Sequence, residues 1–449
     1  MNQPRRSRGP ETGQTSPAAV DADAPMTADS KRAVAAAFAG WTMDAFDYFI
    51  VILVYADIAK SFHVSLTRMA FLTTATLIMR PIGAAIFGLW ADRVGRRKAL
   101  IVDVSFYSIV GFACAFAPNF GVLFALRLLY GIGMGGEWGL GASLAMEKVP
   151  PKRRGLISGI LQQGYSVGYL LAALAYLMVN DFTDLGWRGL FALSLLPALL
   201  SLFLRSRVTE SETWVETRAN AARNGVTVRQ ILSQPAVLRR LVYLVLLMTA
   251  FTWMSHGSGD IYPTFLKDGL HFAPNTALYV AMLYNVGAII GGTLIGALSE
   301  RLGRRAVVIG CSLLALPLVP LFAASHTLGM VCLGSFLMQV AVQGAWGVIP
   351  AHLTEMSPPE IRGFYPGVTY QLGNCLAAFN LPIQQKLAQS HSYTFALTVT
   401  MVPVLITVAV LAAIGKEARG GRLSTGGEPP TGSGGAPMLG AAVDSRAAG

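Results

Sequence analysis

Asp44 and Asp47 stand three residues apart in the stretch GWTMDAFDYF, where most neighbours are apolar. Residues with this spacing share one face of a helix. Two carboxylates held close together cannot both ionise cheaply, so one of them can keep a proton near neutral pH. The pair is therefore a candidate proton carrier, although either acid could instead cap a helix or pair with an arginine.

Arg80 lies in a second apolar stretch, LIMRPIGAAIFG. An ionised side chain at the centre of a bilayer costs about 2.5–3.5 kcal/mol, so such a residue is a candidate for function. A guanidinium there needs an anion, and a substrate carboxylate fits its two-pronged geometry. The alternative is an ion pair with Asp44 or Asp47, and the two arrangements could alternate during a cycle.

His256 and Asp260 occur in MSHGSGDIYPTF, four residues apart and therefore on one helix face. The carboxylate stabilises the imidazolium and burial opposes it, so the pair can titrate in the physiological range. Gly257, Gly259 and Pro263 weaken the helix, which predicts an interrupted helix that exposes backbone to a cavity. A structural hydrogen bond is the competing interpretation. A metal site is not expected, because one His and one Asp fall short of the usual ligand set.

Arg127 and Glu137 lie ten residues apart in LFALRLLYGIGMGGEW. That spacing is about 15 Å along a helix, so the two side chains are not expected to pair. Glu137 is a candidate for a second proton site. Arg127 is as well suited to a general structural or coupling role as to substrate contact.

Long apolar runs must position these residues. The chain has 449 residues, of which 53% are hydrophobic and 13% charged, and its mean hydropathy is +0.51. Runs of about 20 apolar residues are long enough to cross a bilayer as helices. We therefore predict an all-α integral membrane protein with twelve transmembrane helices. The predicted spans are 33–58, 69–91, 99–117, 120–146, 155–179, 187–206, 238–262, 276–298, 306–324, 328–351, 363–384 and 394–414.

The spans divide into two groups of six. We expect a disordered tail at 1–32, a six-helix bundle at 33–206, an inter-bundle loop at 207–237, a second bundle at 238–414 and a disordered tail at 415–449. No signal peptide is expected, because the first span is long and carries acids. The four cysteines all fall in spans and indicate no disulfide framework.

The net charge of +11 is distributed unevenly. Of the 35 Lys and Arg residues, 28 fall in the tails and the even-numbered connections between spans. This positive-inside pattern predicts that both termini are cytoplasmic, in the cell (inner) membrane. It also explains the basic charge through anionic lipid, so no nucleic acid partner is expected. The residues on the opposite side are Lys60, Arg68, Arg188, Lys267 and Lys386.

The two halves repeat at an offset of 208 residues. GLWADRVGRRKAL begins at Gly88 and GALSERLGRRAVV at Gly296, and EKVPPKRRG and EMSPPEIRG show the same offset. Trp138 recurs as Trp346, which indicates homologous bundles. The second half lacks the intramembrane charges of the first. Asp44, Asp47, Arg127 and Glu137 correspond to Thr252, Ser255, Ser335 and Ala345.

The loop after the second span resembles the G-x-x-x-D-R-x-G-R-R/K signature of the major facilitator superfamily, and the fourth span resembles that superfamily's signature with an intramembrane Arg. The resemblance implies two six-helix bundles that rock about a central site. Charge-assisted contacts at the loop could latch the cytoplasmic side, although the arginines could simply hold the loop inside. The expected latch residues are Gly88, Asp92, Arg93, Gly95, Arg96 and Arg127.

The stretch TWMSHGSGDIYPT is similar to the span 7 signature of the lactate and pyruvate permeases, N-x-x-S/T-H-x-S/T-Q-D-x-x-x-T. Here Thr252 replaces the Asn and Gly259 replaces the Gln. YQLGN is similar to that group's Gln and Asn pair in span 11, here Gln371 and Asn374. Arg80 matches the group's span 2 arginine, which is associated with carboxylate binding. DAFDYF and GIGMGGEWGLGASL are similar to the sialate:proton symporter family, which includes these permeases.

The resemblance implies proton-driven import of a small organic acid, with lactate or pyruvate first. The expected substrate-binding residues are Arg80, Gln371, Asn374 and His256, and the expected proton-coupling residues are Asp44, Asp47, Glu137 and Asp260. The alternatives are a sialic acid or aromatic acid symporter, a drug or metabolite exporter, and a nutrient sensor. No enzyme activity, cofactor or metal is expected, and no nucleotide-binding loop is present. A monomer is expected.

Overall fold

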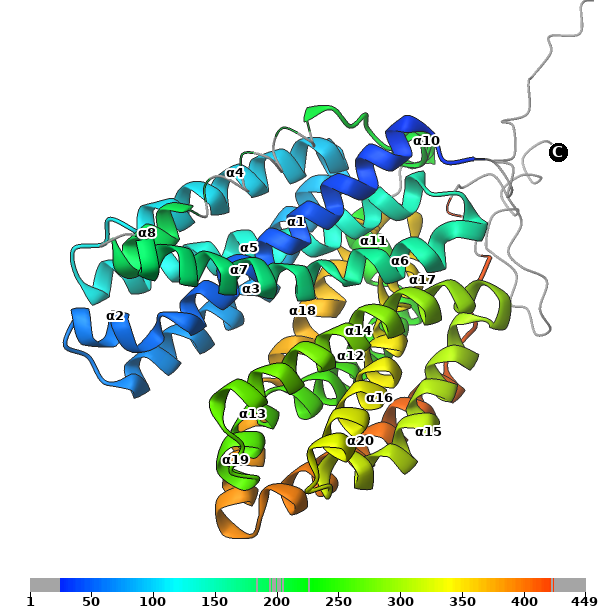
Figure 1. Ribbon diagram of the computed structural model, residues 1–449. Helices are drawn as coiled ribbons and strands as arrows, with labels where there is room; N and C mark the ends of the chain where they lie inside the picture. The colour runs from blue at the N-terminus through cyan, green and yellow to red at the C-terminus, as the bar shows by residue number, and fades with distance from the viewer. Residues whose placement is uncertain are drawn as a thin grey trace, which may run out of the picture.

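The computed structural model describes residues 25–182, 185–193, 206–224 and 227–420, together with Leu195, Leu199, Phe203 and Leu423. All regular structure within this part of the chain is helical. Figure 1 shows two bundles of long helices, which meet near α6 and α17 and diverge toward α2 and α19. The all-α prediction is therefore confirmed.

The first bundle is built from the N-terminal half of the chain. Its helices are α1 (Ala28–Leu53), α2 (Tyr55–Ser61), α3 (Leu66–Val94), α4 (Arg96–Cys114), α5 (Phe120–Lys148), α6 (Arg154–Gln162), α7 (Gly164–Phe182) and α8 (Gly186–Leu193), with a 3-10 turn at Pro151–Arg153. Side chains that accept hydrogen bonds from the first turn begin several of these helices, as helix N-caps do. Thr27 caps α1, Ser65 caps α3 and Asn119 caps α5.

The second bundle has a matching set of helices. They are α12 (Pro235–Gly259), α13 (Tyr262–Thr264), α14 (Pro274–Leu302), α15 (Arg304–Ala323), α16 (Leu328–Trp346), α17 (Ile349–Met356), α18 (Tyr365–Ala377), α19 (Asn380–Ser390) and α20 (Tyr393–Ile414), with a π turn at Phe265–Gly269 and a 3-10 turn at Pro359–Ile361. In the first bundle α3 packs along α5, and in the second α14 packs along α16. The repeat in the sequence is thus a repeat in packing.

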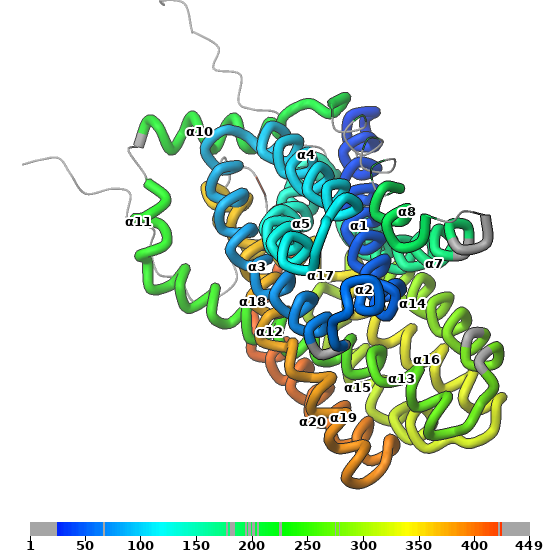
Figure 2. Tube along the Cα trace, turned by 90° about the vertical axis from the view of Figure 1, so that its left-hand side faces the viewer, coloured from blue at the N-terminus to red at the C-terminus, as the bar shows by residue number. Residues whose placement is uncertain are grey.

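Two helices connect the bundles. They are α10 (Glu212–Asn224) and α11 (Val228–Leu232), and Figure 2 shows them beside the bundles, leading from the first bundle to α12. They lie within the predicted inter-bundle loop at 207–237, so much of that loop is helical. The bundles touch directly through α6 against α14, and through α18 against α3 and α5.

The turn between α3 and α4 requires a glycine. Gly95 has a φ of 111° and Gly303, at the equivalent turn between α14 and α15, has a φ of 97°. L side chains rarely adopt this conformation, whereas glycine does so at little cost. We call the end of the molecule that carries these two turns the basic end, and the end that carries α2, α13 and α19 the open end.

Eight helical segments in the described part of the chain are long and apolar enough to cross a membrane. Of the other predicted spans, 99–117 falls on α4, 155–179 on α6 and α7, and 363–384 on α18 and α19. The span predicted at 187–206 includes α8, but much of it lies outside the described residues. The spans predicted at 155–179 and 363–384 are each divided between two shorter helices, so neither forms one continuous membrane-spanning helix.

The ends of the chain differ in part from the predicted tails. Helix α1 begins at Ala28, so the last residues of the tail predicted at 1–32 are helical. Residues 415–420 are described and pack near α15, where Glu417 accepts hydrogen bonds from the backbone N–H groups of Arg304 and Arg305. The remainder of both predicted tails, 1–24 and most of 421–449, lies outside the described residues.

Candidate functional site

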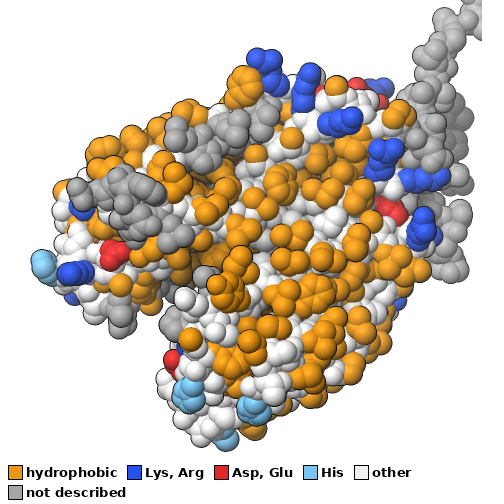
Figure 3. Space-filling view, viewed as in Figure 1, with side chains coloured by type: hydrophobic (Ala, Val, Ile, Leu, Met, Phe, Trp, Pro, Cys, Tyr) orange, Lys and Arg blue, Asp and Glu red, His pale blue; other side chains and the backbone are white. Residues whose placement is uncertain are grey.

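A cavity of about 510 Å³ lies between the two bundles. Its wall includes Asp44 and Arg80 from the first bundle and His256 and Asn374 from the second. Tyr55 of α2 and Gln385 of α19 also line it, so it extends to the open end. Figure 3 shows the molecule hollowed between its two lobes on that side. We call this space the central cavity.

Arg80 and Asp44 form an ion pair at the wall of the central cavity. Their Nη2 and Oδ2 atoms are 2.5 Å apart, and the two residues are 7% and 1% exposed. Arg80 is held in place because α5 packs tightly against α3: a Cβ on Gly135 would lie 2.0 Å from the Arg80 carbonyl oxygen. Arg80 Nε and Asp44 Oδ1 have no hydrogen-bond partner among the described residues. The Arg80 Nε–H group can therefore still donate a hydrogen bond, and Asp44 Oδ1 can still accept one.

Asp47 points away from the central cavity. Its carboxylate accepts a hydrogen bond of 2.8 Å from the hydroxyl of Tyr130 on α5. The Arg127 guanidinium lies over the ring of the same tyrosine, 4.2 Å from its centroid. Asp44 and Asp47 were predicted to share a helix face, but the structure directs them to different partners. Arg127 thus lies with Asp47 inside the first bundle, away from the other expected latch residues.

Glu137 is buried in α5, with 1% of its surface exposed. It is not among the described residues that line the central cavity. Of the first bundle's predicted proton-coupling acids, Asp44 therefore lies among the described residues of the cavity wall and Glu137 does not.

His256 and Asp260 line the central cavity from the second bundle. His256 Nδ1 lies 3.0 Å from Asp260 Oδ2, and about a third of each side chain is exposed. Helix α12 ends at Gly259, and the chain resumes as α13 at Tyr262. The interrupted helix expected from Gly257, Gly259 and Pro263 is present.

Glutamines from neighbouring helices hold the interrupted segment. Gln384 donates to the carbonyl oxygen of Gly257 at 2.9 Å, and Gln343 donates to the hydroxyl of Ser255 at 3.1 Å. Gln339 donates to the hydroxyl of Ser258 at 3.0 Å. None of these three glutamines was predicted from the sequence. Their signal was present as lone amides in apolar runs, with Gln339 and Gln343 spaced four residues apart in LMQVAVQGAW.

Asn374 and Gln371 have different surroundings. Asn374 lines the central cavity and accepts a hydrogen bond of 2.8 Å from Thr252. Gln371 is only 1% exposed, does not line the described cavity wall, and has no hydrogen-bond partner for either amide atom among the described residues. Gln371 is therefore withdrawn from the cavity in this conformation.

An aromatic layer lies at the inner part of the central cavity. Trp138 of α5 stacks on Tyr370 of α18, with ring centroids 3.9 Å apart at 21°. Trp41 and Trp346 meet the same tyrosine edge-on, at 6.0 and 5.9 Å. Because these four rings come from both bundles, they close the cavity toward the basic end. We call them the aromatic floor.

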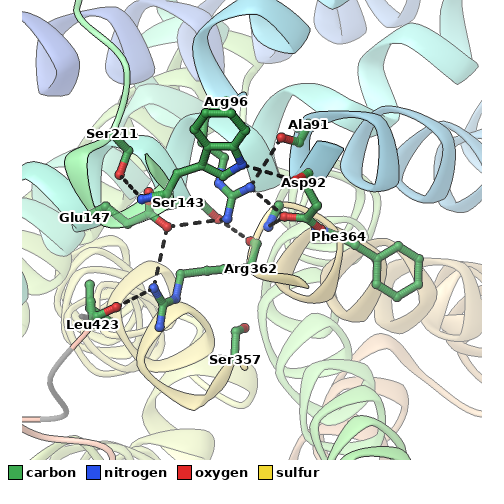
Figure 4. Close-up of polar contacts among 12 residues, drawn as sticks. Ala91, Asp92, Arg96, Ser143, Glu147, Ser211, Ser357, Arg362, Phe364 and Leu423 are labelled. Atoms are coloured by element: carbon green, nitrogen blue, oxygen red, sulfur yellow. Dashed lines mark hydrogen bonds and ion pairs between the residues drawn. The ribbon is translucent and has the colours of Figure 1, made fainter. Parts of the chain in front are cut away.

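The basic end is closed by ionic contacts, drawn in Figure 4. Arg96 is fully buried, 2.5 Å from Asp92 and 3.5 Å from Glu147. Asp92 also accepts hydrogen bonds of 2.8 and 3.0 Å from the backbone of Gly363 and Phe364 in the other bundle. These contacts, together with Arg362 at 3.6 Å from Glu147, form what we call the first latch.

The other expected latch residues have separate places. Gly88 lies where the bundles touch, because a Cβ on it would be 2.6 Å from the Phe364 Cα atom. Gly95 makes the turn into α4, and Arg93 is exposed. Glu210, which precedes α10, accepts hydrogen bonds from the first backbone N–H groups of α4. This contact was not predicted from the sequence.

A second latch repeats the first at the offset of 208. Arg304 lies 2.6 Å from Glu300 and 3.1 Å from Glu355, and Arg154 lies 3.9 Å from Glu355. Glu300 accepts a hydrogen bond from the backbone N–H of Gly155 in the other bundle. The two latches join the bundles at the basic end, so the central cavity is reached from the open end. Among the described residues, no cluster of three His, Cys, Asp or Glu could hold a metal ion.

Two family descriptions match the chain. Residues 32–237 match "Sugar (and other) transporter" and residues 258–441 match "Major Facilitator Superfamily". With the fold and the repeated latches, these matches place the chain in the major facilitator superfamily, whose members are transporters. The chain is a multi-pass membrane protein and a secondary transporter of small metabolites.

Relatives with described substrates are distant. The carboxylic acid transporter protein homolog of Saccharomyces cerevisiae is 27% identical over 78% of this chain, which spans 60% of that relative's length. The sialic acid transporter NanX of Escherichia coli is 26% identical over 76% of this chain and 84% of its own. The cis,cis-muconate transport protein of Acinetobacter baylyi is 28% identical over 76% of this chain and 84% of its own length.

A solved structure supports the fold. The proton:xylose symporter XylE, bound to 6-bromo-6-deoxy-D-glucose, superposes with a TM-score of 0.72. The match covers 89% of this chain and 98% of that one, with 18% sequence identity. At this identity the likeness concerns the arrangement of helices.

Proposed function

We propose that this protein is a proton-coupled symporter that imports a small organic acid anion across the inner membrane, with lactate and pyruvate as the first candidates. The observation that carries the proposal is the Arg80–Asp44 pair at the wall of the central cavity. The motif similarity to lactate and pyruvate permeases and the organic acids named for several relatives support the substrate class.

The pair suggests how proton and substrate are coupled. In this mechanism a substrate carboxylate binds the Arg80 guanidinium in place of Asp44. The displaced carboxylate is 1% exposed, and a buried carboxylate without a partner favours its protonated form. Asp44 therefore binds a proton as the substrate binds, and releases it when the substrate leaves and the ion pair re-forms. One proton carried with one monoanion is electroneutral, so the pH gradient drives uptake.

The second bundle would complete the site. Asn374 and His256 face the same cavity and offer hydrogen bonds to the rest of the substrate. The His256–Asp260 pair is a second place where a proton can reside. Gln371 would join the site only in another conformation, after the aromatic floor has moved.

The orientation follows from the distribution of positive charge. The basic end would face the cytoplasm, with both termini on that side. The closed latches at that end and the accessible central cavity then describe an outward-open conformation. The bundles would rock to close the open end and part the latches, which delivers the substrate inside.

The test is uptake of labelled lactate into proteoliposomes under an inward proton gradient, with pyruvate, sialic acid and benzoate as competitors. We expect accumulation that depends on the gradient and is lost in Arg80→Gln. Arg229→Gln is the matched control, because Arg229 is exposed on α11, outside the latches and the cavity. Gradient-independent uptake would refute proton coupling, and a wild-type rate in Arg80→Gln would remove that residue from the site. Stronger competition by sialic acid or benzoate would replace lactate as the substrate.

A further inference from the structure

A second cavity, of about 360 Å³, adjoins the central cavity. Tyr165, Ser255, His256, Asp260 and Gln343 are among the residues that line both spaces. The second space continues between α1 and α7 of the first bundle and α12 to α14 of the second. We call it the side cavity. Its volume lies within the ordinary range for small-molecule sites, roughly 300–1,000 Å³.

Aromatic side chains from both bundles face the side cavity. On the first bundle, Phe49 packs edge-on against Tyr165 and Tyr169, with centroids 5.1 and 4.9 Å apart. On the second, Tyr262 and Tyr284 stack with centroids 6.3 Å apart at 23°. The remaining wall is mixed, with aliphatic side chains such as Ile52 and Leu266 beside polar ones such as Asn285 and Gln339. A space with aromatic rings on two sides suits a planar ring, because such rings gain from stacked and edge-on contacts.

The side cavity also explains the departure at Gly259. This sequence has Gly259 where the lactate and pyruvate permease motif that it resembles has a Gln. In the structure Gly259 lines the side cavity, and a Cβ on it would lie 2.8 Å from the Tyr284 hydroxyl oxygen. Any longer side chain at position 259 would therefore compete with Tyr284 for the same space. The glycine leaves that space to the tyrosine and to the cavity beside it.

We propose that the side cavity is a subsite for the planar ring of an aromatic carboxylate whose carboxylate group lies in the central cavity. The inference rests on the proposed function for the position of the carboxylate near Arg80. Lactate and pyruvate are too short to occupy both spaces, so they use the central cavity alone. An aromatic acid uses both, with its ring passing His256 at the junction. The subsite thus widens the substrate range from small acids to ring-bearing acids.

The test measures binding to the purified full-length protein, without a gradient, by isothermal titration calorimetry. The probes are lactate, benzoate, 1-naphthoate and the neutral 1-naphthalenemethanol. We expect 1-naphthoate to bind at least tenfold more tightly than lactate and than the neutral alcohol. Equal or weaker binding of 1-naphthoate relative to lactate would overturn the proposal, and so would equal binding of the alcohol.

Ala281 on α14 lines the side cavity and not the central one, so Ala281→Leu fills the subsite selectively. We expect this variant to raise the Kd for 1-naphthoate at least tenfold and to change the Kd for lactate less than twofold. Ala70 lines only the central cavity, so Ala70→Leu is the matched control and should not discriminate against the ring in this way. Equal effects of Ala281→Leu on both acids would overturn the proposal.

A second variant, Gly259→Gln, guards against misfolding of the first. It introduces the side chain that the permease motif has at this position. The nearest atom to the new Cβ would be the hydroxyl oxygen of Tyr284, at the end of a flexible side chain. We expect it to weaken 1-naphthoate binding and preserve lactate binding, and unchanged 1-naphthoate binding would count against the subsite. Binding of both acids without gradient-driven uptake would refute the proposed function and not the subsite. Proton-driven lactate uptake without tight 1-naphthoate binding would refute only the subsite.

Discussion

The two bundles have equivalent ionic contacts at the basic end but different residues at their centres. At the basic end, the ionic partners of Arg96 recur around Arg304 at the offset of 208 residues. At the centre, Asp44 of the first bundle corresponds to Thr252 of the second, which makes a neutral hydrogen bond to Asn374. Both latches close the same end and therefore need equivalent parts. A binding site on the surface between the bundles needs each group only once, so the two copies are free to diverge.

The largest effect is expected at the centre of the first bundle. Asp44→Asn leaves the buried Arg80 without its partner, and an uncompensated buried charge costs about 3–5 kcal/mol. We expect gradient-driven uptake to fall by roughly 100-fold or more, with a lower melting temperature in detergent. Its counterpart, Thr252→Val, removes one neutral hydrogen bond worth about 1 kcal/mol, so uptake should fall less than about tenfold.

A double variant separates charge from packing. Adding Arg80→Gln to Asp44→Asn removes the orphaned cation, so the melting temperature should recover while uptake stays low. Normal accumulation of substrate by Asp44→Asn would contradict the claim that transport depends more on Asp44 than on its counterpart Thr252.

The two latches are expected to differ in strength. The Asp92 side chain is 1% exposed and accepts two backbone hydrogen bonds from the other bundle, whereas the Glu300 side chain is 16% exposed and accepts one. A hydrogen bond to a charged group contributes about 1.5–3 kcal/mol. Asp92→Asn should therefore reduce closure of the basic end about tenfold more than Glu300→Gln.

Cys375 provides the measurement for the latches, because it lines the central cavity while Cys114 and Cys311 are buried. In a Cys332→Ser background, a membrane-impermeant thiol reagent applied at the open end should modify Asp92→Asn more slowly than the Cys332→Ser parent. Equal rates in Asp92→Asn and Glu300→Gln would make the latches equivalent.

The interrupted segment of the second bundle should be moderately sensitive. Gln384 is fully buried and donates to both the Gly257 carbonyl oxygen and the Thr400 hydroxyl. Gln384→Met leaves those acceptors unpaired, so we expect a loss of about 1–3 kcal/mol in the free energy of unfolding. The neighbouring Gln385 is exposed and is the matched control. Equal thermal shifts in Gln384→Met and Gln385→Met would show that the two hydrogen bonds of Gln384 contribute nothing to stability.

The smallest effect is expected where the chain caps α15. Burial raises the pKa of Glu417, but hydrogen bonds from the backbone N–H groups of Arg419, Arg304 and Arg305 outweigh it and hold the pKa below 4.5. The stabilisation is therefore complete above pH 4.5 and is lost as the pH falls through the lowered value. Glu417→Gln should lower the free energy of unfolding by about 1 kcal/mol at pH 7.

Thermal unfolding between pH 7 and pH 3.5 checks this prediction. The difference in melting temperature between wild type and Glu417→Gln should stay constant down to about pH 5 and then shrink. A difference that grows on acidification would contradict the sign. Glu210→Gln provides the corresponding change at α4 of the first bundle.

Local patterns in the sequence predicted the helical fold well. Apolar runs of sufficient length located most of the helices, and the repeated motifs located the equivalent latch arginines Arg96 and Arg304. The glycines around His256 located the interrupted helix. These features depend on residues close together in the chain or on a simple repeat.

Features that depend on the rotation of whole helices were not predictable in this way. The spacing of Asp44 and Asp47 allows a shared face but cannot say that one carboxylate meets Arg80 and the other Tyr130. Gln371 resembles a site residue in its motif, yet helix packing withdraws it from the cavity. The hydrogen bonds of Gln384 and Glu210 join segments more than a hundred residues apart.

The aromatic floor also gives the molecule an internal optical reporter. Trp138 and Tyr370 stack across the two bundles at 3.9 Å, so the proposed parting of the basic end would separate their rings. Indole emission depends on its immediate surroundings. Each transport cycle should therefore alter the intrinsic fluorescence of the unlabelled protein. The rate of the change between the outward-open and inward-open conformations could then be measured in a stopped-flow instrument.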